Sequence, residues 1–452
     1  MNSIGASILA FLAVVVLFGQ RRWALMGMMA GVLYLTQFQA INVLGFNLFA
    51  VRFLELFGFI RVMVRKEFSF SWLNKTDWAL LLFFGFTTIV FCLRSSDGQA
   101  NMIGTAVDAF LCYFAFRGLI GGMEDFRWFL RSFLLLLAPY ALMVLFESWT
   151  HHDVFSFIGA GIGSWMRGDR FRCVGSFRNP DLLGSLGACF LPLYIGMACI
   201  KAQRKLACIG IVLCLLIVWA SNSGGPLCAT AVGLIGWGFW RLRMQMRKVR
   251  WAMAAAIAAL VMVMKAPIWY LLARVSDITG GDGWHRAYLL DVSFQHLGLW
   301  WLAGMNILET ADWFPDGALT STGAADITNQ FLSFGLTAGL GAMALLILLL
   351  ARAFSDLGKA LAVVRSHSQE TSDNEFLLWG LGVMLTVHIA NWFGITYFDQ
   401  FYVIWFMQLA AISSISSSYM ALQSQASDAV DLPEEVETLQ PAAQFRRELA
   451  QE

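Results

Sequence analysis

The chain has 452 residues and a net charge of +1; 58% of its residues are hydrophobic and only 13% are charged. Soluble domains carry about 25% charged residues. A mean hydropathy of +0.65 implies more apolar surface than one soluble core can bury. The composition therefore excludes a soluble protein, and the near-zero net charge argues against a nucleic-acid partner.

Apolar runs bounded by charged residues predict about thirteen membrane-spanning helices. The first run lacks both a preceding basic segment and a clear small-residue cleavage site, so we interpret it as a retained span. We expect an all-α polytopic integral membrane protein with about 12–13 transmembrane helices. The runs cover roughly residues 4–19, 23–43, 46–64, 77–93, 101–121, 127–147, 181–200, 206–221, 224–240, 251–272, 328–351, 375–395 and 398–419.

Lys and Arg concentrate in alternate connections, which is typical of loops on the cytoplasmic side. This pattern places the N-terminus outside and the C-terminus inside. It also places two long loops, roughly 148–180 and 273–327, on the outer, periplasmic face. Residues 1–422 are expected to form the transmembrane domain, and the acidic residues 423–452 a disordered cytoplasmic tail.

Three charged residues lie inside or beside the third apolar run. Arg52 and Glu55 are three residues apart, a spacing at which a helix lets them pair, and we expect a structural ion pair. Arg61 is expected to extend its guanidinium to the cytoplasmic surface.

The first long loop ends in "RFRCVGSFRNP" (170–180), whose arginines run against the positive-inside trend. A guanidinium stays charged and grips phosphate through two parallel hydrogen bonds, which suits a lipid diphosphate at a membrane surface. The simpler alternative is that Arg167 and Arg170 pair with Asp169 and with lipid phosphates. No His, Asp and Glu cluster with metal-ligand spacing stands out, so we expect no metal and no cofactor.

The second long loop predicts a short helix over residues 284–299 that lies along the membrane interface and carries His285 and Arg286. Farther along, Asp326, Thr328 and Asn329 are expected at the start of the next span. The two loops thus bring arginines from distant parts of the sequence to one face of the membrane.

These stretches resemble motifs of the O-antigen polymerase and O-antigen ligase superfamily, the Wzy and WaaL type proteins of bacterial surface polysaccharide assembly. "RCVGSFRNP" is similar to the family's R-x-x-G-x-F-x-N-P. "HRAYLLDVSFQHLGLWWLAGMN" is similar to its arginine-led helix with a glycine-containing turn. "TNQFLSFGLTAGLGAM" is similar to the opening of a late span, and "SNSGGPLCATAVGL" is a weaker match. Together the matches cover most of residues 75–420.

The resemblance implies a GT-C-like glycosyltransferase in the bacterial inner membrane. Its donor would be a glycan on undecaprenyl diphosphate at the periplasmic face, with a chain-length regulator as a possible protein partner. Arg172 and Arg286 would hold the diphosphate, and Arg178 joins them on proximity alone.

Thr328 stands where ligases of the family carry a histidine that activates the acceptor hydroxyl, and threonine cannot act as a base. Asp326 is the nearest replacement, and His285 is the second candidate. Against these roles, Asp326 can be a helix cap and His285 can simply cover the interface.

The missing histidine favours a polymerase of lipid-linked repeats over a ligase that transfers finished glycan to an acceptor lipid or protein. A third interpretation is that the protein is a lipid-linked glycan transporter or flippase. It is weakened because no internal repeat is visible and the polar residues gather in the outer loops. A membrane scaffold would leave the outer arginines unexplained.

Overall fold

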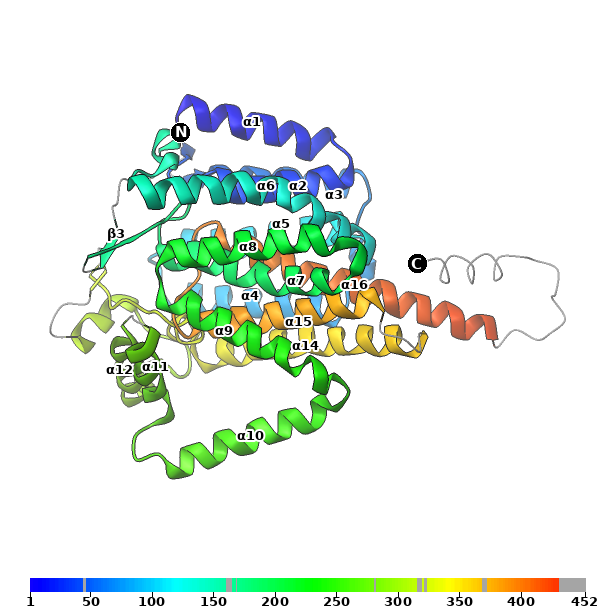
Figure 1. The fold of residues 1–452 in the computed structure, drawn as a ribbon. Coiled ribbons are helices and arrows are strands. Elements are labelled where there is room, and N and C mark those ends of the chain that lie inside the picture. Colours follow the sequence, from blue (N-terminus) through cyan, green and yellow to red (C-terminus); the bar gives the residue numbers. More distant parts are fainter. Residues whose placement is uncertain are drawn as a thin grey trace, which may run out of the picture.

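The computed structural model describes residues 1–43, 46–159, 165–167, 169–279, 282–314, 319–320, 323–367 and 372–430. Nearly all regular structure is helical, and the long helices lie side by side in one bundle (Figure 1). The helices are α1 (Ser3–Phe18), α2 (Arg21–Tyr34), α3 (Ala50–Val64), α4 (Lys75–Arg94), α5 (Gln99–Leu119), α6 (Met123–Thr150), α7 (Pro180–Cys199), α8 (Arg204–Ser221), α9 (Gly224–Gly238), α10 (Met246–Val263), α11 (Leu271–Thr279), α12 (Gly283–Gln295), α13 (Leu297–Trp300), α14 (Gln330–His367), α15 (Asp373–Trp392) and α16 (Phe401–Val430).

Two short antiparallel hairpins accompany the helices. Strand β1 (Ala40–Val43) pairs with β2 (Phe46–Phe49), and β3 (Trp165–Arg167) pairs with β4 (Arg170–Arg172). Helix α16 continues to Val430, beyond the predicted boundary of the transmembrane domain. Residues 431–452 of the predicted tail lie outside the described part of the chain.

Helices occupy every predicted span, but fewer than thirteen of those in the described part of the chain are long and apolar enough to cross a membrane. Among the described residues, seven helices are long and apolar enough to cross a membrane: α4, α5, α6, α7, α8, α14 and α16. A pair of segments bent by 96°, Gly224–Val263 and Ile268–Asp277, would make an eighth. Helices α1, α2, α3 and α9 have 14 to 16 residues, and at 1.5 Å per residue such helices reach only about 21–24 Å. Hydropathy located the helices, but it did not reveal that strands β1 and β2 occupy part of the runs 23–43 and 46–64 and leave α2 and α3 short.

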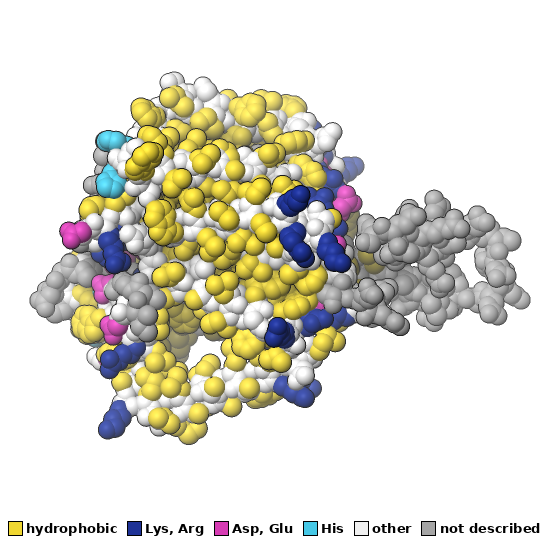
Figure 2. Space-filling view, in the orientation of Figure 1, with side chains coloured by type: hydrophobic (Ala, Val, Ile, Leu, Met, Phe, Trp, Pro, Cys, Tyr) yellow, Lys and Arg dark blue, Asp and Glu magenta, His cyan; other side chains and the backbone are white. Residues whose placement is uncertain are grey.

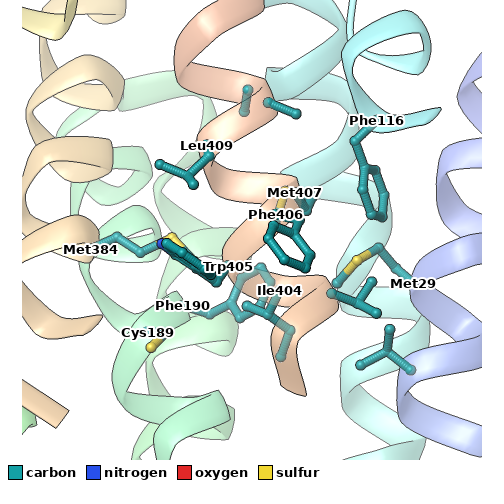
Figure 3. Close-up of a cluster of buried hydrophobic side chains, with 14 of the residues drawn as sticks. Met29, Phe116, Cys189, Phe190, Met384, Ile404, Trp405, Phe406, Met407 and Leu409 are labelled. Atoms are coloured by element: carbon teal, nitrogen blue, oxygen red, sulfur yellow. The ribbon is translucent and has the colours of Figure 1, made fainter. Parts of the chain in front are cut away.

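The core of the bundle is built around α16. Its side chains Ile404, Trp405 and Phe406 are buried between α7, α15 and the N-terminal helices, and Met29 and Phe116 close the cluster from α2 and α5 (Figure 3). Because these helices are far apart in the sequence, α16 joins the two halves of the chain.

The two ends of the bundle differ. The end that holds β3 and α12, here called the hairpin end, also holds the N-terminus, while α16 projects from the opposite end (Figure 1). At that opposite, basic end, Arg22 pairs with Asp125 at 2.8 Å and Arg243 pairs with Glu375 at 3.1 Å. Lys and Arg side chains gather there on the visible face (Figure 2). The hairpin β3–β4 and these basic connections are therefore at opposite ends of the bundle.

Helix α14 is broken near its start. Ala338 and Gly339 leave helical geometry, and Gly339 has φ +80°. The turn after α13 inserts at this point: the Met305 N–H donates to the Leu336 carbonyl at 2.8 Å, and the Leu340 N–H donates to the Trp301 carbonyl at 2.8 Å. The break thus seats the second long loop against α14 without leaving these backbone groups unpaired.

Two predictions about charges in the third apolar run were wrong. Arg52 pairs with Asp108 of α5 at 2.7 Å instead of with Glu55. Arg61 is buried, donates to the Val16 and Gly19 carbonyls at the end of α1, and pairs with Glu67. Arg52 thus has a closer partner on another helix, and Arg61 is buried by contacts to the end of α1 instead of reaching the surface.

Candidate functional site

The segment that follows β4 folds into the protein and fixes the position of Arg172. The Glu147 carboxylate of α6 accepts the N–H groups of Val174 at 2.7 Å and Gly175 at 2.9 Å. Gly175 has φ +56°, and a Cβ there would lie 2.6 Å from the Tyr140 hydroxyl oxygen, so the close approach needs a glycine. Arg172 therefore sits at the edge of a buried and hydrogen-bonded turn.

The chain enters α7 as the Asn-Pro sequence predicts. The Asn179 side chain accepts the N–H of Asp181 at 2.7 Å, and Pro180 occupies the first helical turn. This entry places the Asp181 carboxylate beside Arg172.

Arg172 is only 6% exposed and makes two polar contacts. Its guanidinium donates to the Ser223 hydroxyl at 2.6 Å and lies 3.4 Å from the Asp181 carboxylate. The Arg172 Nε is buried and has no hydrogen-bond partner in the described structure. Burial lowers the pKa of Arg172; Asp181 raises it, and the nearby charges of Arg167 and Arg286 lower it further. A buried cation with an unused donor is suited to binding an anion.

Arg286 reaches the same place from α12. A Cβ built on Gly225 would lie 3.9 Å from a terminal guanidinium nitrogen of Arg286 and 3.7 Å from Asp181 Oδ1, and a Cβ on Gly394 would lie 3.5 Å from Arg286 Cζ. The Arg286 side chain makes no hydrogen bond or ion pair with any described residue, and Asp181 Oδ1 is buried without a partner. Two guanidinium groups from distant loops thus approach one carboxylate, and one of them has no partner of its own.

Further arginines extend this cluster along the hairpin. Arg167 and Arg170 are partners across β3 and β4, and Arg172 follows Arg170 by two residues, so all three side chains leave the same face of the hairpin. Like charges directly opposite each other destabilise a strand pair. Arg167 and Arg170 are exposed, and neither makes an ion pair with a described residue. The simpler alternative, in which these two arginines pair with Asp169, would require such an ion pair. The three arginines therefore form a row on one face of the hairpin, in which Arg167 and Arg170 are exposed and Arg172 is buried.

Arg178 lies apart from the place where Arg172 and Arg286 approach Asp181. Its Nε donates to the Asp399 carboxylate at 2.5 Å, a second guanidinium nitrogen pairs with the same carboxylate, and its Cζ lies 5.7 Å from the centre of the Phe398 ring. Its charge is therefore matched within the protein, unlike that of Arg286.

His285 and Asp326 meet, but through a backbone atom. His285 Nε2 lies 3.1 Å from the Asp326 carbonyl oxygen, and its ring packs on Phe314 at a centroid distance of 4.8 Å. Through this contact His285 helps to hold the backbone at Asp326 in place. The Asp326 side chain is exposed; desolvation by neighbouring protein atoms raises its pKa, while the charges of His285 and Arg286 oppose that shift. Asp326 is exposed, whereas His285 is buried with one ring nitrogen engaged, so Asp326 is the more accessible of the two candidate bases.

The Thr328 hydroxyl also lies in this segment. Its oxygen is buried and has no hydrogen-bond partner among the described residues. The Thr328 N–H donates to the Asp326 carbonyl at 3.0 Å, the same oxygen that His285 approaches. The 326–328 segment is thus held by its backbone, and of its three side chains only that of Asp326 is exposed.

An apolar cavity of about 540 Å³ lies along the same helix as Arg286. Leu290 and Phe294 line it, and they follow Arg286 at intervals of four residues, so the three side chains share one face of α12. The cavity therefore lies farther along the face of α12 that carries Arg286. Its other lining residues are Ile268, Trp269, Leu271, Leu272, Trp300, Asn329, Phe331, Leu332, Met343, Ile347 and Phe393.

Sequence reasoning missed several polar residues of the site. Asp181 and Glu147 lie at the ends of apolar runs, where acidic residues are common, and nothing in the sequence singled them out. Ser223 and Gly225 lay within the weak Ser/Gly match, which was the available signal. Comparisons with protein-family models, curated proteins and solved structures found no match for this chain.

Proposed function

We propose that this protein is a membrane glycosyltransferase that polymerises oligosaccharide repeats carried on undecaprenyl diphosphate, at the periplasmic face of a bacterial inner membrane. The observation that carries the proposal is the approach of Arg172 and Arg286 to one incompletely bonded carboxylate, with an apolar cavity farther along the same face of α12. An amphiphile with an anionic head and a long apolar tail matches both parts.

The charges favour a diphosphate over a single carboxylate as the ligand. A diphosphate offers several oxygens, and each guanidinium can engage two of them. Because Arg172 is buried, its interaction with a phosphate is stronger than it would be in bulk water. The exposed Arg167 and Arg170 would raise the local concentration of an anionic substrate near the site.

In the proposed reaction a hydroxyl of the acceptor sugar attacks the anomeric carbon of the donor. The new bond joins the acceptor oxygen to that carbon, the bond to the diphosphate oxygen breaks, and configuration inverts. Arg172 and Arg286 stabilise the charge that develops on the leaving diphosphate. The Asp326 carboxylate accepts the proton from the attacking hydroxyl.

The resemblance to O-antigen polymerases and ligases supports the same reaction class. A ligase would use the same donor contacts, so the arginines do not separate the two activities. Thr328 in place of the ligase histidine favours polymerisation, and the buried hydroxyl of Thr328 accepts no proton in the proposed reaction. A GT-C-like fold is part of this proposal.

The test replaces Arg172 and Arg286 singly by Gln in cells, at matched membrane levels of the protein. Each replacement should reduce chain extension about a hundredfold, equivalent to about 3 kcal/mol of lost transition-state stabilisation. Arg250→Gln, an exposed arginine at the basic end, is the matched control and should leave polymer length unchanged. The readout is the size distribution of the surface polysaccharide.

Three outcomes are distinguishable. Collapse to single repeat units supports a polymerase. Full-length polymer that accumulates on the carrier lipid identifies a ligase instead. Unchanged polymer length in both site variants contradicts the proposal and favours a transporter.

A further inference from the structure

The connection between α15 and α16, residues 393–400, contacts two segments of the candidate site that come from other parts of the chain. Gly394 lies beside Arg286 of α12, where a Cβ would be 3.5 Å from the Arg286 Cζ and 3.8 Å from its Nε. Two residues farther along, the Thr396 hydroxyl donates to the carbonyl of Ile327, the residue after the proposed base. One short connection thus contacts both the cation proposed to hold the donor and the segment that carries the base.

The same connection is also bonded to the segment that follows Arg172. Asp399 pairs with Arg178, and the buried Gln400 side chain donates to the Ser176 carbonyl at 2.9 Å. All three segments that carry the proposed site residues are therefore in contact with this one connection.

Tyr397 fixes the connection within the bundle. It is 1% exposed, and its hydroxyl oxygen lies 2.7 Å from Nδ1 of the fully buried His388 on α15. The Tyr397 backbone N–H donates to the side-chain oxygen of Gln330, the first residue of α14, at 2.6 Å. At the end of α15, the Gly394 N–H donates to the Asn391 carbonyl at 2.8 Å. Because buried polar groups are costly to leave without a partner, these contacts hold the connection in one geometry.

The position of this connection matters because neither proposed reactive group is held by an ion pair. The Arg286 side chain makes no hydrogen bond or ion pair with any described residue, and the Asp326 side chain is exposed. The two charges nonetheless interact, since Arg286 lowers the pKa of Asp326 against the larger effect of desolvation. When two groups on different segments act together, a misplacement of about 1 Å can slow a reaction about a hundredfold.

We propose that the connection between α15 and α16 sets the position of Arg286 relative to Asp326. Thr396 is the positioning residue for Asp326, because its hydroxyl holds the adjacent backbone. Gly394 is the positioning residue for Arg286, because a larger side chain there would occupy the place of the guanidinium. Their effect on glycan transfer rests on the proposed function, whereas the contacts themselves can be tested without it.

The first measurement is the steady-state rate of glycan transfer by the purified full-length protein in liposomes, with a polyprenyl-diphosphate-linked saccharide as donor. Thr396→Val keeps the shape of the side chain and removes the hydroxyl, and it should lower kcat about tenfold with an unchanged donor KM. Thr396→Ser keeps the hydroxyl and should restore kcat. Thr386→Val is the matched control and should change neither constant, because the Thr386 hydroxyl donates to the Gly382 carbonyl of its own helix at 3.0 Å.

The Gly394 variants act on the donor instead. Gly394→Leu should displace the Arg286 guanidinium and raise the donor KM about tenfold while also lowering kcat, because Arg286 contacts the diphosphate before and during transfer. Gly394→Ala should behave as wild type, since a Cβ has room at 3.5 Å.

The second measurement does not depend on activity. The Thr328 N–H donates to the Asp326 carbonyl at 3.0 Å, so its hydrogen exchange reports how firmly this segment is held. Exchange should be about tenfold faster in Thr396→Val than in wild type, and unchanged in Thr396→Ser and Thr386→Val.

The outcomes separate this proposal from the proposed function. Wild-type exchange in Thr396→Val overturns the proposal, and so does faster exchange with an unchanged kcat. A wild-type donor KM in Gly394→Leu contradicts the role of Gly394. If Arg286→Gln transfers glycan at the wild-type rate, the proposed function fails, and the exchange measurement alone decides whether the connection holds the base segment. If Thr396→Val does not fold, Gln330→Met takes its place, because it removes the acceptor of the N–H that follows Thr396 and should speed the same exchange.

Discussion

At the scale of single residues, the candidate site depends on which polar groups already have partners. From the sequence, Arg178 and Arg286 were both candidates for binding the diphosphate. The structure gives Arg178 a carboxylate, Asp399, and leaves Arg286 without one among the described residues. The same distinction separates His285, whose ring nitrogen meets a backbone carbonyl, from Asp326, whose carboxyl group is exposed. A residue with an unmet charge or proton-accepting group is the better candidate for contact with substrate.

Asp326 predicts a pH dependence. Desolvation raises its pKa above the ordinary value for aspartate, and a base acts in its deprotonated form. In the proposed reaction, glycan transfer should therefore be fastest at neutral pH and should fall as pH drops through this raised pKa. Asp326→Asn should slow transfer about a hundredfold and remove the acid limb. The measurement is the rate of purified protein on a polyprenyl-diphosphate-linked saccharide between about pH 4 and pH 8.

His285→Asn is the companion variant. It removes the contact to the Asp326 carbonyl and should lower thermal stability, yet the acid limb should remain. If the acid limb persists in Asp326→Asn and disappears in His285→Asn, then His285 is the base and Asp326 is not.

At the scale of elements, the break in α14 connects the second long loop to the bundle. Two glycines make the crossing possible: a Cβ on Gly339 would lie 2.3 Å from the Leu302 carbonyl oxygen, and a Cβ on Gly304 would lie 2.3 Å from the Leu336 carbonyl oxygen. Arg94 donates to the Thr337 carbonyl at 3.3 Å, which pairs another group at the break. Because α12 and α13 precede this crossing, its geometry helps to set where Arg286 lies.

Gly339→Ala should therefore destabilise the protein. Both the positive φ and the backbone contact oppose a side chain, and we expect a loss of about 3 kcal/mol in the free energy of unfolding. Gly358→Ala is the matched control in the same helix, since a Cβ there meets nothing within 4 Å, and its effect should stay within about 1 kcal/mol. Thermal unfolding in detergent measures both. Equal melting temperatures for the two variants would show that the break is not needed for stability.

At the scale of the whole molecule, the bundle separates an arginine-bearing hairpin at one end from basic connections at the other. The basic end is held by buried polar contacts: the Asp77 carboxylate accepts from Arg117 at 3.1 Å and from the Ser413 hydroxyl at 2.7 Å. The hairpin end holds the candidate site. This separation matches the loop pattern that predicts a periplasmic site.

The orientation predicts how single cysteines react in intact cells. Met166→Cys, 54% exposed in β3, should react with a membrane-impermeant maleimide added from the periplasm. Met244→Cys, 72% exposed at the basic end, should react only after the membrane is permeabilised. The native Cys199 and Cys208 are exposed and are replaced by serine in both proteins. The opposite labelling pattern would invert the proposed orientation and place the candidate site in the cytoplasm.

The sequence by itself determined the class of the protein and the position of its helices. It also singled out Arg172, Arg286 and Asp326. These features depend on local composition: an apolar run is recognisable without its neighbours, and an arginine in an outer loop is conspicuous wherever that loop packs. Only the tertiary structure decided that Arg172 and Arg286 approach each other, that Arg52 pairs with Asp108, and that α14 breaks to admit the second loop. These contacts join residues far apart in the chain, and which partner a charge or carbonyl finds depends on how the helices pack.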